Sequence, residues 1–251
     1  MIDLRGLHNK MKLEVFNLSK KFNKITAVNN LSFLIEKNKT LGLLGPNGCG
    51  KTTAIGMMLG LITPSNGKVL INDEIFNNSN KINLLSQMNF ASPYIELPKK
   101  LTVIQNLEIY ARLYGVTNFK QRIEEMTEEL DLKNFLKKKT GELSSGQKNR
   151  VSLAKSLINK PKLLFLDEPT ASLDPDIGSF VRDYLVKYKS KNELTILLAS
   201  HNMNEVEKLC DNIIMMKNGQ IVDRGTCKQL IEKHGRGTLE ETFLKIARSK
   251  K

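Results

Sequence analysis

Continuous apolar runs alternate with amphipathic stretches along most of this chain. Three of the runs are apolar almost throughout, namely TLGLLG (40–45), KLLFLD (162–167) and LTILLAS (194–200). Such runs are typical of strands that are buried on both faces of a parallel sheet. Because helical crossovers join parallel strands, the alternation predicts an α/β fold with these runs as its central strands.

Other segments alternate apolar and polar residues, as strands with one solvated face do. They are KLEVFNLSKKF (12–22), NLSFLIEK (30–37), KVLIND (68–73) and IIMMKNGQIV (213–222). Within the last of them, Asn218 and Gly219 predict a tight hairpin turn. We expect all four segments to form an antiparallel β flank beside the parallel core.

The strand pattern gives way to helical spacing between about residues 98 and 160. Apolar residues such as Ile123, Met126 and Leu130 recur there every three or four positions among charged residues. We predict a helical subdomain inserted into an α/β domain that spans residues 11–237. A last amphipathic helix is expected within 238–251, from Leu239 to Ala247, and residues 1–10 are interpreted as an N-terminal extension.

The segment GPNGCGKTT (45–53) follows an apolar strand and opens a helix, which is the setting of a phosphate-binding loop, or P-loop. Its glycines let successive backbone N–H groups surround phosphate oxygens, and the helix N-terminus adds a favourable dipole. The lysine would reach the β- and γ-phosphates, and the first threonine would bind Mg²⁺. The candidate nucleotide-binding residues are Gly45, Pro46, Asn47, Gly48, Cys49, Gly50, Lys51, Thr52 and Thr53.

A pair of carboxylates ends the buried run LLFLDEP (163–169). A carboxylate at the end of a buried strand can hold Mg²⁺, and a second one directly after it can polarise the attacking water. We assign Asp167 to the metal, together with Thr52, and Glu168 to the general base. An Asp-Glu pair alone is common surface charge, but beside a P-loop it is specific.

The segment LSSGQKNR (143–150) resembles the signature motif of the ATP-binding cassette (ABC) ATPases, usually LSGGQ. The order of motifs also resembles that family from residue 11 to about residue 230: P-loop, helical segment, signature, LLFLDEP, ASLDP (171–175) and an isolated histidine. The resemblance implies a RecA-like P-loop NTPase core and hydrolysis of ATP with Mg²⁺. It also implies a dimer in which the P-loop of one copy faces the signature of the other, with ATP between them.

The resemblance assigns further roles by position. Asp174 resembles the aspartate that communicates across the dimer. His201 resembles the switch histidine that touches the γ-phosphate, and it would act with Lys51 and Glu168 in catalysis. Phe22 resembles the aromatic residue that stacks on adenine, with an ordinary core phenylalanine as the alternative.

The signature segment itself supplies four candidate nucleotide contacts, Ser144, Ser145, Gly146 and Gln147. The hydroxyl of Ser144 and the helix N-terminus would meet the γ-phosphate held by the other copy. A simple helix cap is the alternative interpretation of this segment. Ser145 replaces the usual glycine, a small change that should still permit the phosphate to approach.

A second departure concerns the loop in which the family usually has a metal-facing glutamine. Counting back from LTVIQNL (101–107) puts Pro93 at that position, and Gln87 lies six residues too early. Either the loop is rearranged, or Mg²⁺ keeps a water molecule in place of the glutamine oxygen, which costs little because Mg²⁺ normally retains several waters.

Composition limits the classes of function. The net charge of +13 arises from 39 basic and 26 acidic residues that are scattered, which favours a solvated surface over a nucleic-acid site. No apolar run approaches the roughly 18 residues of a membrane helix. The three cysteines, Cys49, Cys210 and Cys227, lack the spacing of a zinc site or a disulfide framework and suit a reducing cytoplasm.

The resemblance therefore implies the ATP-hydrolysing subunit of an ABC membrane transporter. It would be peripheral, on the cytoplasmic side of the membrane, and would drive a separate transmembrane permease subunit as a dimer. The tail GTLEETFLKIAR (237–248) resembles exporter-type cassettes, which favours export. The alternatives are a soluble ABC ATPase that acts on nucleic acid or ribosomes and an ATPase that assembles a cofactor cluster; no stable nucleic-acid partner is expected.

Overall fold

The computed structural model describes residues 11–93, 96–171 and 173–248, so the predicted extension at residues 1–10 lies outside the described part of the chain. The strands of the described residues are β1 (Leu13–Phe22), β2 (Ile25–Ile35), β3 (Thr40–Leu44), β4 (Asn66–Ile71), β5 (Glu74–Ile75), β6 (Met88–Ala91), β7 (Leu163–Asp167), β8 (Thr195–Ala199), β9 (Asn212–Lys217) and β10 (Gln220–Gly225). The helices are α1 (Lys51–Met58), α2 (Lys81–Leu85), α3 (Val103–Leu113), α4 (Phe119–Glu129), α5 (Ser145–Leu157), α6 (Pro175–Asn192), α7 (Met203–Leu209), α8 (Cys227–His234) and α9 (Leu239–Arg248).

The core is a six-stranded sheet with the strand order β10-β9-β3-β8-β7-β6. Its strands from β9 to β6 are parallel, and β10 is antiparallel at one edge. Every residue of β3, β7 and β8 is buried, as the continuously apolar runs predict. The predicted α/β fold is therefore confirmed.

A second, antiparallel sheet has the order β2-β1-β4-β5 and forms the predicted flank. The prediction was wrong for the segment 213–222, because β9 pairs in parallel with β3 and belongs to the core sheet. Its four apolar residues are buried, because Ile213 and Met215 pack against the C-terminal helices on one face and Ile214 and Met216 pack into the central core on the other. The predicted turn is confirmed, since Asn218 and Gly219 have positive φ angles of 49° and 76°.

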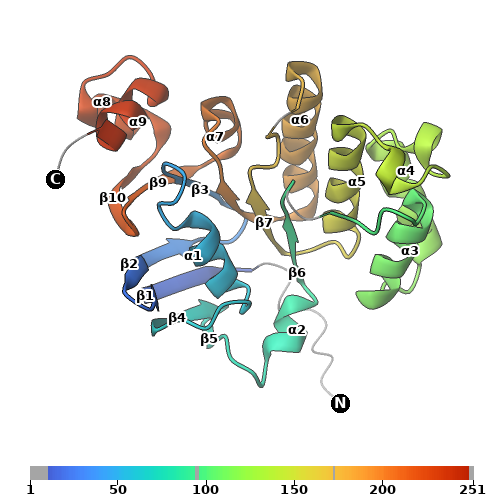
Figure 1. Cartoon of the computed structure of the whole chain (residues 1–251), viewed down its shortest axis with the longest axis horizontal. Coiled ribbons are helices and arrows are strands. Elements are labelled where there is room, and N and C mark those ends of the chain that lie inside the picture. Colours follow the sequence, from blue (N-terminus) through green and yellow to red (C-terminus); the bar gives the residue numbers. More distant parts are fainter. Residues whose placement is uncertain (1–10, 94–95, 172, 249–251) are drawn as a thin grey trace.

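Helices α3, α4 and α5 occupy the segment predicted to be helical and gather at one end of the molecule (Figure 1). They pack together through buried residues such as Leu107, Met126 and Val151. We propose on this ground that residues from about 98 to 160 form a subdomain of the domain spanning 11–237.

The C-terminal helices α8 and α9 lie at the opposite end of the molecule and pack on β9 (Figure 1). The last helix, predicted from Leu239 to Ala247, is confirmed as α9 and ends at Arg248. We propose residues 238–251 as a C-terminal element separate from the cassette, although 249–251 lie outside the described residues. No helix in the described part of the chain is both long and apolar enough to cross a membrane.

Candidate functional site

The P-loop connects the buried strand β3 to helix α1. Gly48 and Gly50 have φ angles of 78° and 106°, in the left-handed region that favours glycine. A Cβ atom on Gly50 would also overlap the carbonyl oxygen of Ala27. Gly50 is the N-cap of α1, so the loop directs backbone N–H groups of the helix N-terminus toward the loop's concave side.

The other residues of the loop divide into buried and exposed positions. Cys49 is buried, and burial raises the pKa of its thiol, which agrees with a packing role for this side chain. Lys51 is the first residue of α1 and is only 7% exposed. Its Nζ donates to the carbonyl oxygen of Gly45 at 2.6 Å and lies 3.4 Å from that of Pro46.

Asp167 and Thr52 meet at the carboxyl end of the core sheet. Thr52 Oγ1 donates to Asp167 Oδ2 at 3.1 Å, which joins α1 to the last residue of β7. Burial raises the pKa of Asp167, and the neighbouring charge of Glu168 raises it further, against the hydrogen bond from Thr52. A nearby cation would stabilise the ionised form of this buried carboxyl group.

These two groups fit one metal ion in particular. No cluster of three or more His, Cys, Asp or Glu residues within the described ranges could enclose a metal on its own. Mg²⁺ does not need such a cage, because it binds through one or two protein oxygens, substrate phosphates and water. The carboxylate of Asp167 and the hydroxyl of Thr52, close to the P-loop, match that requirement.

Glu168 contacts His201, although the two residues are far apart in the sequence. His201 Nδ1 lies 2.6 Å from Glu168 Oε1, and the backbone N–H of His201 donates to Glu168 Oε2 at 3.4 Å. The contact arises because β7 and β8 are adjacent parallel strands, and each residue follows the carboxyl end of its strand. The structure thus brings together the predicted general base and the predicted switch histidine.

Two further polar residues beside this pair were not predicted. Ser200 Oγ lies 2.5 Å from Glu205 Oε2 and 3.5 Å from Glu168 Oε2, so its hydroxyl sits between two carboxyl groups. Glu205 is 1% exposed, and burial raises its pKa while the hydrogen bond from Ser200 opposes that shift. The spacing of Asn202 and Glu205 is a helix-start signal that predicts α7, but it does not reveal that Glu205 points inward.

The predicted signature residues lie at the N-terminus of α5. Ser144 Oγ accepts from the backbone N–H of Gln147, and Gln147 Oε1 accepts from the backbone N–H of Ser144, which makes a capping box. The helix-cap interpretation is therefore confirmed as a structural role of Ser144. Gly146 is buried against Ile177, whereas Ser144 and Ser145 remain exposed and accessible to a partner.

The signature and the P-loop of one copy belong to different parts of the fold. Helix α5 packs on the edge strand β6, which is three strand positions from β3 in the core sheet. At the usual strand spacing that separation is about 14 Å. Figure 1 shows α1 and α5 on different sides of the molecule, with β7 and α6 between them.

Other predicted site residues lie at or near the surface. Asp174 is the exposed N-cap of α6, and its side chain makes no capping hydrogen bond. Asn47 is also exposed within the P-loop, and Thr53 is partly buried on α1. Phe22 ends β1 and is 45% exposed, with Lys20 Nζ 5.0 Å from its ring centroid, so the core alternative for Phe22 is wrong.

The loop after β6 has the predicted departure from the family pattern. Pro93 follows the carboxyl end of β6 by two residues, whereas Gln87 precedes the strand at its other end. Gln87 therefore lies at the opposite end of β6 from this loop and cannot replace the loop's glutamine. An apolar pocket of about 290 Å³ adjoins Pro93 and lies between this loop, α5 and the segment after β7.

Comparison with known proteins identifies relatives of the whole chain. A family model described as "ABC transporter" matches residues 28–171. The Nod factor export ATP-binding protein I of Rhizobium sp. (strain N33) is 33% identical over 228 residues, which cover 90% of this chain and 74% of that protein. The bacitracin transport ATP-binding protein BcrA of Enterococcus faecalis is 34% identical over 90% of this chain and 73% of its own length.

A solved structure shares the same fold. It is described as an ATP-binding subunit of an ABC transporter and superimposes with a TM-score of 0.85 at 25% sequence identity. The match covers 94% of this chain and 99% of the solved chain. The similarity therefore extends well beyond the family segment at residues 28–171.

Proposed function

The chain belongs to the ABC transporter family as an ATP-binding, ATP-hydrolysing subunit, and we propose that it drives export through a separate membrane subunit. The observation that carries the proposal is the contact between Glu168 and His201, next to the pair formed by Thr52 and Asp167. The proposed general base, the proposed switch histidine and the proposed metal-binding pair lie near the carboxyl ends of the core strands, beside the P-loop.

In this proposal the P-loop binds the phosphates of ATP. Backbone N–H groups at the end of the loop and the start of α1 surround the phosphate oxygens, and Lys51 Nζ neutralises charge on the β- and γ-phosphates. Phe22 lies exposed at the end of β1 and stacks on the adenine ring.

Asp167 and Thr52 would hold Mg²⁺. The ion supplies charge neutralisation at the phosphoryl group when it is bound. The buried carboxyl of Asp167 and the hydroxyl that donates to it support the assignment, since their oxygens are the ligands Mg²⁺ prefers. Pro93 offers no side-chain ligand, so water would complete the coordination on that side.

Glu168 acts as the general base of hydrolysis. Its carboxylate accepts a proton from the attacking water, and His201 fixes the orientation of the carboxylate through the 2.6 Å contact with Oε1. The φ of 55° at Glu168 supports the role, because a non-glycine residue in the left-handed region is uncommon and often marks a functional site.

Two copies of the chain would close around two ATP molecules. The N-terminus of α5 cannot reach the P-loop of its own copy if the separation of about 14 Å at the sheet is kept. Ser144, Ser145, Gly146 and Gln147 would instead meet the γ-phosphate held by a second copy, with Asp174 beside them. The exposure of Ser144, Ser145 and Asp174 supports this arrangement.

Export is the direction that the relatives favour, since two of them carry export or transport of a compound in their names. We propose that the chain is peripheral on the cytoplasmic face of the membrane and binds a permease subunit. The apolar pocket beside Pro93 lies between the helical subdomain and the core, so a permease segment docked there would contact both parts. Cargo specificity would lie in the permease.

The substitution Glu168→Gln tests the proposed chemistry. It keeps the size and hydrogen bonding of the side chain but removes the base, so the hydrolysis rate should fall by about 10² to 10⁴ while ATP still binds. Because hydrolysis opens the dimer, the variant should accumulate as an ATP-bound dimer in size-exclusion chromatography. The exposed residue Glu74 provides a matched control, Glu74→Gln. A Glu168→Gln variant that turns over at the native rate as a monomer in saturating Mg²⁺-ATP would refute the proposal.

A further inference from the structure

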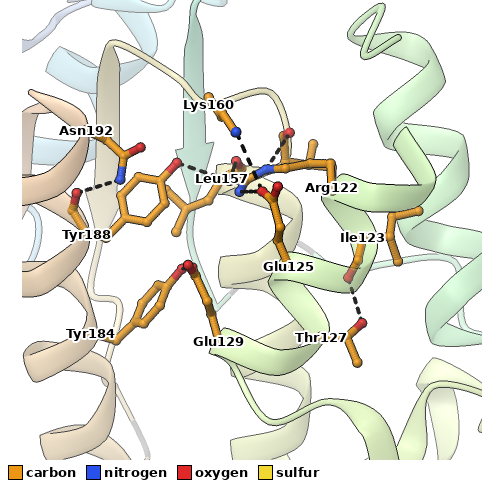
Figure 2. A network of polar contacts seen from close by, with 11 residues as sticks. Arg122, Ile123, Glu125, Thr127, Glu129, Leu157, Lys160, Tyr184, Tyr188 and Asn192 are labelled. Atoms are coloured by element: carbon orange, nitrogen blue, oxygen red, sulfur yellow. Dashed lines mark hydrogen bonds and ion pairs between the residues drawn. The ribbon is translucent and has the colours of Figure 1, made fainter. Parts of the chain in front are cut away.

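Arg122 is a buried cation on α4, far from the P-loop in the fold. Its residue surface is only 6% exposed, which is rare for arginine unless the group is fully paired. The guanidinium donates through Nε to the carbonyl oxygen of Ile158 at 3.2 Å and through Nη2 to that of Leu157 at 2.7 Å. Nη2 also lies 3.1 Å from the hydroxyl of Tyr188, and Nη1 donates to Glu125 Oε2 at 2.8 Å (Figure 2).

Two of these acceptors belong to the C-terminus of α5. Leu157 is the last residue of that helix and Ile158 is its C-cap. Carbonyl groups at a helix C-terminus lack intrahelical donors, and the helix dipole places partial negative charge there. Arg122 therefore donates to both carbonyls, of which that of Leu157 also accepts from the backbone N–H of Lys160, and it complements the dipole. These contacts offset the cost of burying a charge.

The remaining contacts join α4 to α6. Tyr188 is near the C-terminal end of α6, and one turn earlier Tyr184 donates its hydroxyl to Glu129 Oε2 on α4 at 2.6 Å. Burial and the hydrogen bond to Glu129 raise the pKa of Tyr184, so its phenol stays a donor. Figure 2 shows both tyrosine rings extending from α6 toward α4.

The opposite ends of α5 and α6 carry the residues assigned to the dimer site. Ser144 caps the N-terminus of α5, and Asp174 is the residue at the N-cap position of α6. The two helices also touch at that end, where Gly146 packs against Ile177. They are thus held together at both ends, by side-chain packing at one and by Arg122 at the other.

We propose that Arg122 is a positioning residue for the signature segment, because it fixes the C-terminal ends of α5 and α6 whose N-terminal ends face the ATP of a second copy. The proposal rests on the dimer described above. Helix α5 has 13 residues and is therefore about 20 Å long. A tilt of about 5° about its C-terminus would move Ser144 by roughly 2 Å, enough to misplace a phosphate contact.

The test compares Arg122→Met, which removes the guanidinium hydrogen bonds to both carbonyls, with the conservative Arg122→Lys. Each substitution is made in the full chain carrying Glu168→Gln, and the dimer is titrated with Mg²⁺-ATP by size-exclusion chromatography. Arg122→Met should raise the midpoint ATP concentration for dimer formation by about tenfold or more, since several hydrogen bonds are lost. Arg122→Lys keeps the charge but not the planar fork, so it should recover part of the effect.

Further measurements separate positioning from a loss of fold. ATP affinity of the monomer, measured with a fluorescent ATP analogue, should be unchanged because the P-loop lies on β3 and α1. In the otherwise native chain, the ATP concentration that gives half-maximal hydrolysis should rise together with the dimer midpoint, because hydrolysis requires the dimer. Tyr188→Phe removes one acceptor hydroxyl and should shift the dimer midpoint by about threefold in a folded protein. Lys120→Met, an exposed cation on the same helix, should shift nothing.

The outcomes distinguish this proposal from the function on which it rests. If Glu168→Gln alone forms no dimer with ATP, the proposed function fails. If it dimerises and the Arg122 and Tyr188 variants dimerise at the same ATP concentration, the positioning role is refuted and the function stands. A parallel loss of monomer ATP affinity in the Arg122 and Tyr188 variants would also refute positioning, because it would show a general loss of structure.

Discussion

At the scale of single residues, a second buried carboxyl group lies close to the proposed catalytic pair, just after the end of β8. Ser200 is fully buried and lies between the carboxyl groups of Glu168 and Glu205. One oxygen of Glu205, Oε1, is buried without a hydrogen-bond partner among the described residues. A buried carboxyl in this setting favours its protonated form, because ionisation would cost solvation that the protein does not replace.

We predict that Glu205→Gln removes a pH-dependent loss of stability. Burial raises the pKa of Glu205 above its ordinary value of 4.5, and the charge of Glu168 raises it further, while hydrogen bonds from Ser200 and Thr170 and the charge of Arg182 oppose the shift. This carboxyl therefore contributes most to stability below pH 4.5, and its contribution declines as pH rises toward the higher folded-state pKa. The free energy of unfolding of the variant, relative to the wild type, should increase from pH 5 to pH 8.

Urea denaturation at the two pH values measures this difference without nucleotide. Glu207→Gln is a matched control, because Glu207 is exposed on the same helix. If the difference in free energy of unfolding between Glu205→Gln and the wild type is the same at pH 5 and pH 8, as expected for the control, then ionisation of Glu205 does not destabilise the fold and the prediction is wrong.

At the scale of elements, a buried carboxylate adds a polar contact to the apolar packing that attaches the C-terminal helix pair to the core. Asp223 on β10 accepts from Lys233 Nζ at Oδ1 and contacts His234 Nε2 at Oδ2, both at 2.6 Å. Its side chain is only 6% exposed. Both partners lie in the last turn of α8, so the carboxylate also faces the C-terminal end of the helix.

We predict that Asp223→Asn loosens α8 and α9. Burial would raise the pKa of Asp223, but hydrogen bonds from Lys233 and His234 outweigh burial and lower it. The ionised group therefore stabilises the fold above its ordinary pKa of 3.8, and this stabilisation is lost as pH falls through the lowered value. The substitution should cost about 1 to 3 kcal/mol near neutral pH.

Hydrogen exchange read along the chain measures the effect. Amides of α8 and α9 should exchange faster in Asp223→Asn at neutral pH, and the difference from the wild type should shrink in strong acid. Glu232→Gln changes an exposed carboxylate on the same helix and serves as the control. Unchanged protection of both helices in Asp223→Asn would show that apolar packing alone holds them.

Some elements could be predicted from the sequence and others could not, for physical reasons. Strands β3, β7 and β8 are buried on both faces, which leaves a continuous apolar run that is easy to detect. Strand β6 has only four residues in a polar setting, so its pattern carries no such signal. The pairing of β9 with β3 is a long-range contact that periodicity does not encode.

The same distinction applies to the candidate site. Residues 45–53 and 163–168 follow from local motifs, because phosphate and metal binding impose short-range spacing. Arg122 and Glu205 have no such spacing, since their roles depend on burial and on partners far away in the sequence. Thr226 and Gln229 form a capping box at the start of α8, and their spacing is a helix-start signal in the sequence.

At the scale of the whole molecule, the account requires two copies. The P-loop and the signature segment occupy different parts of one chain, on β3 and α1 in the first case and at the start of α5 in the second. A symmetric dimer would place each P-loop opposite the signature of its partner and so complete two sites at once. A single copy would bind ATP at its P-loop but would lack the signature segment that completes the site.

Mixing two inactive variants tests this requirement directly. Lys51→Ala removes the phosphate-binding charge, and Ser144→Arg puts a bulky cation where the signature meets phosphate; each should abolish ATP hydrolysis. Ser144→Arg also removes a helix cap, at a cost of about 1 kcal/mol, so thermal unfolding must confirm that both variants are folded. A mixed dimer contains one intact site, formed by the native P-loop of the Ser144→Arg copy and the native signature of the Lys51→Ala copy.

The ATPase rate of the equimolar mixture is therefore the decisive measurement. If sites form between copies and one intact site can turn over, random pairing restores up to about a quarter of the wild-type rate. If each copy builds its site alone, both variants are defective in themselves and the mixture stays as inactive as either one. Recovery of activity on mixing is the result this account predicts, and a mixture without activity would contradict it.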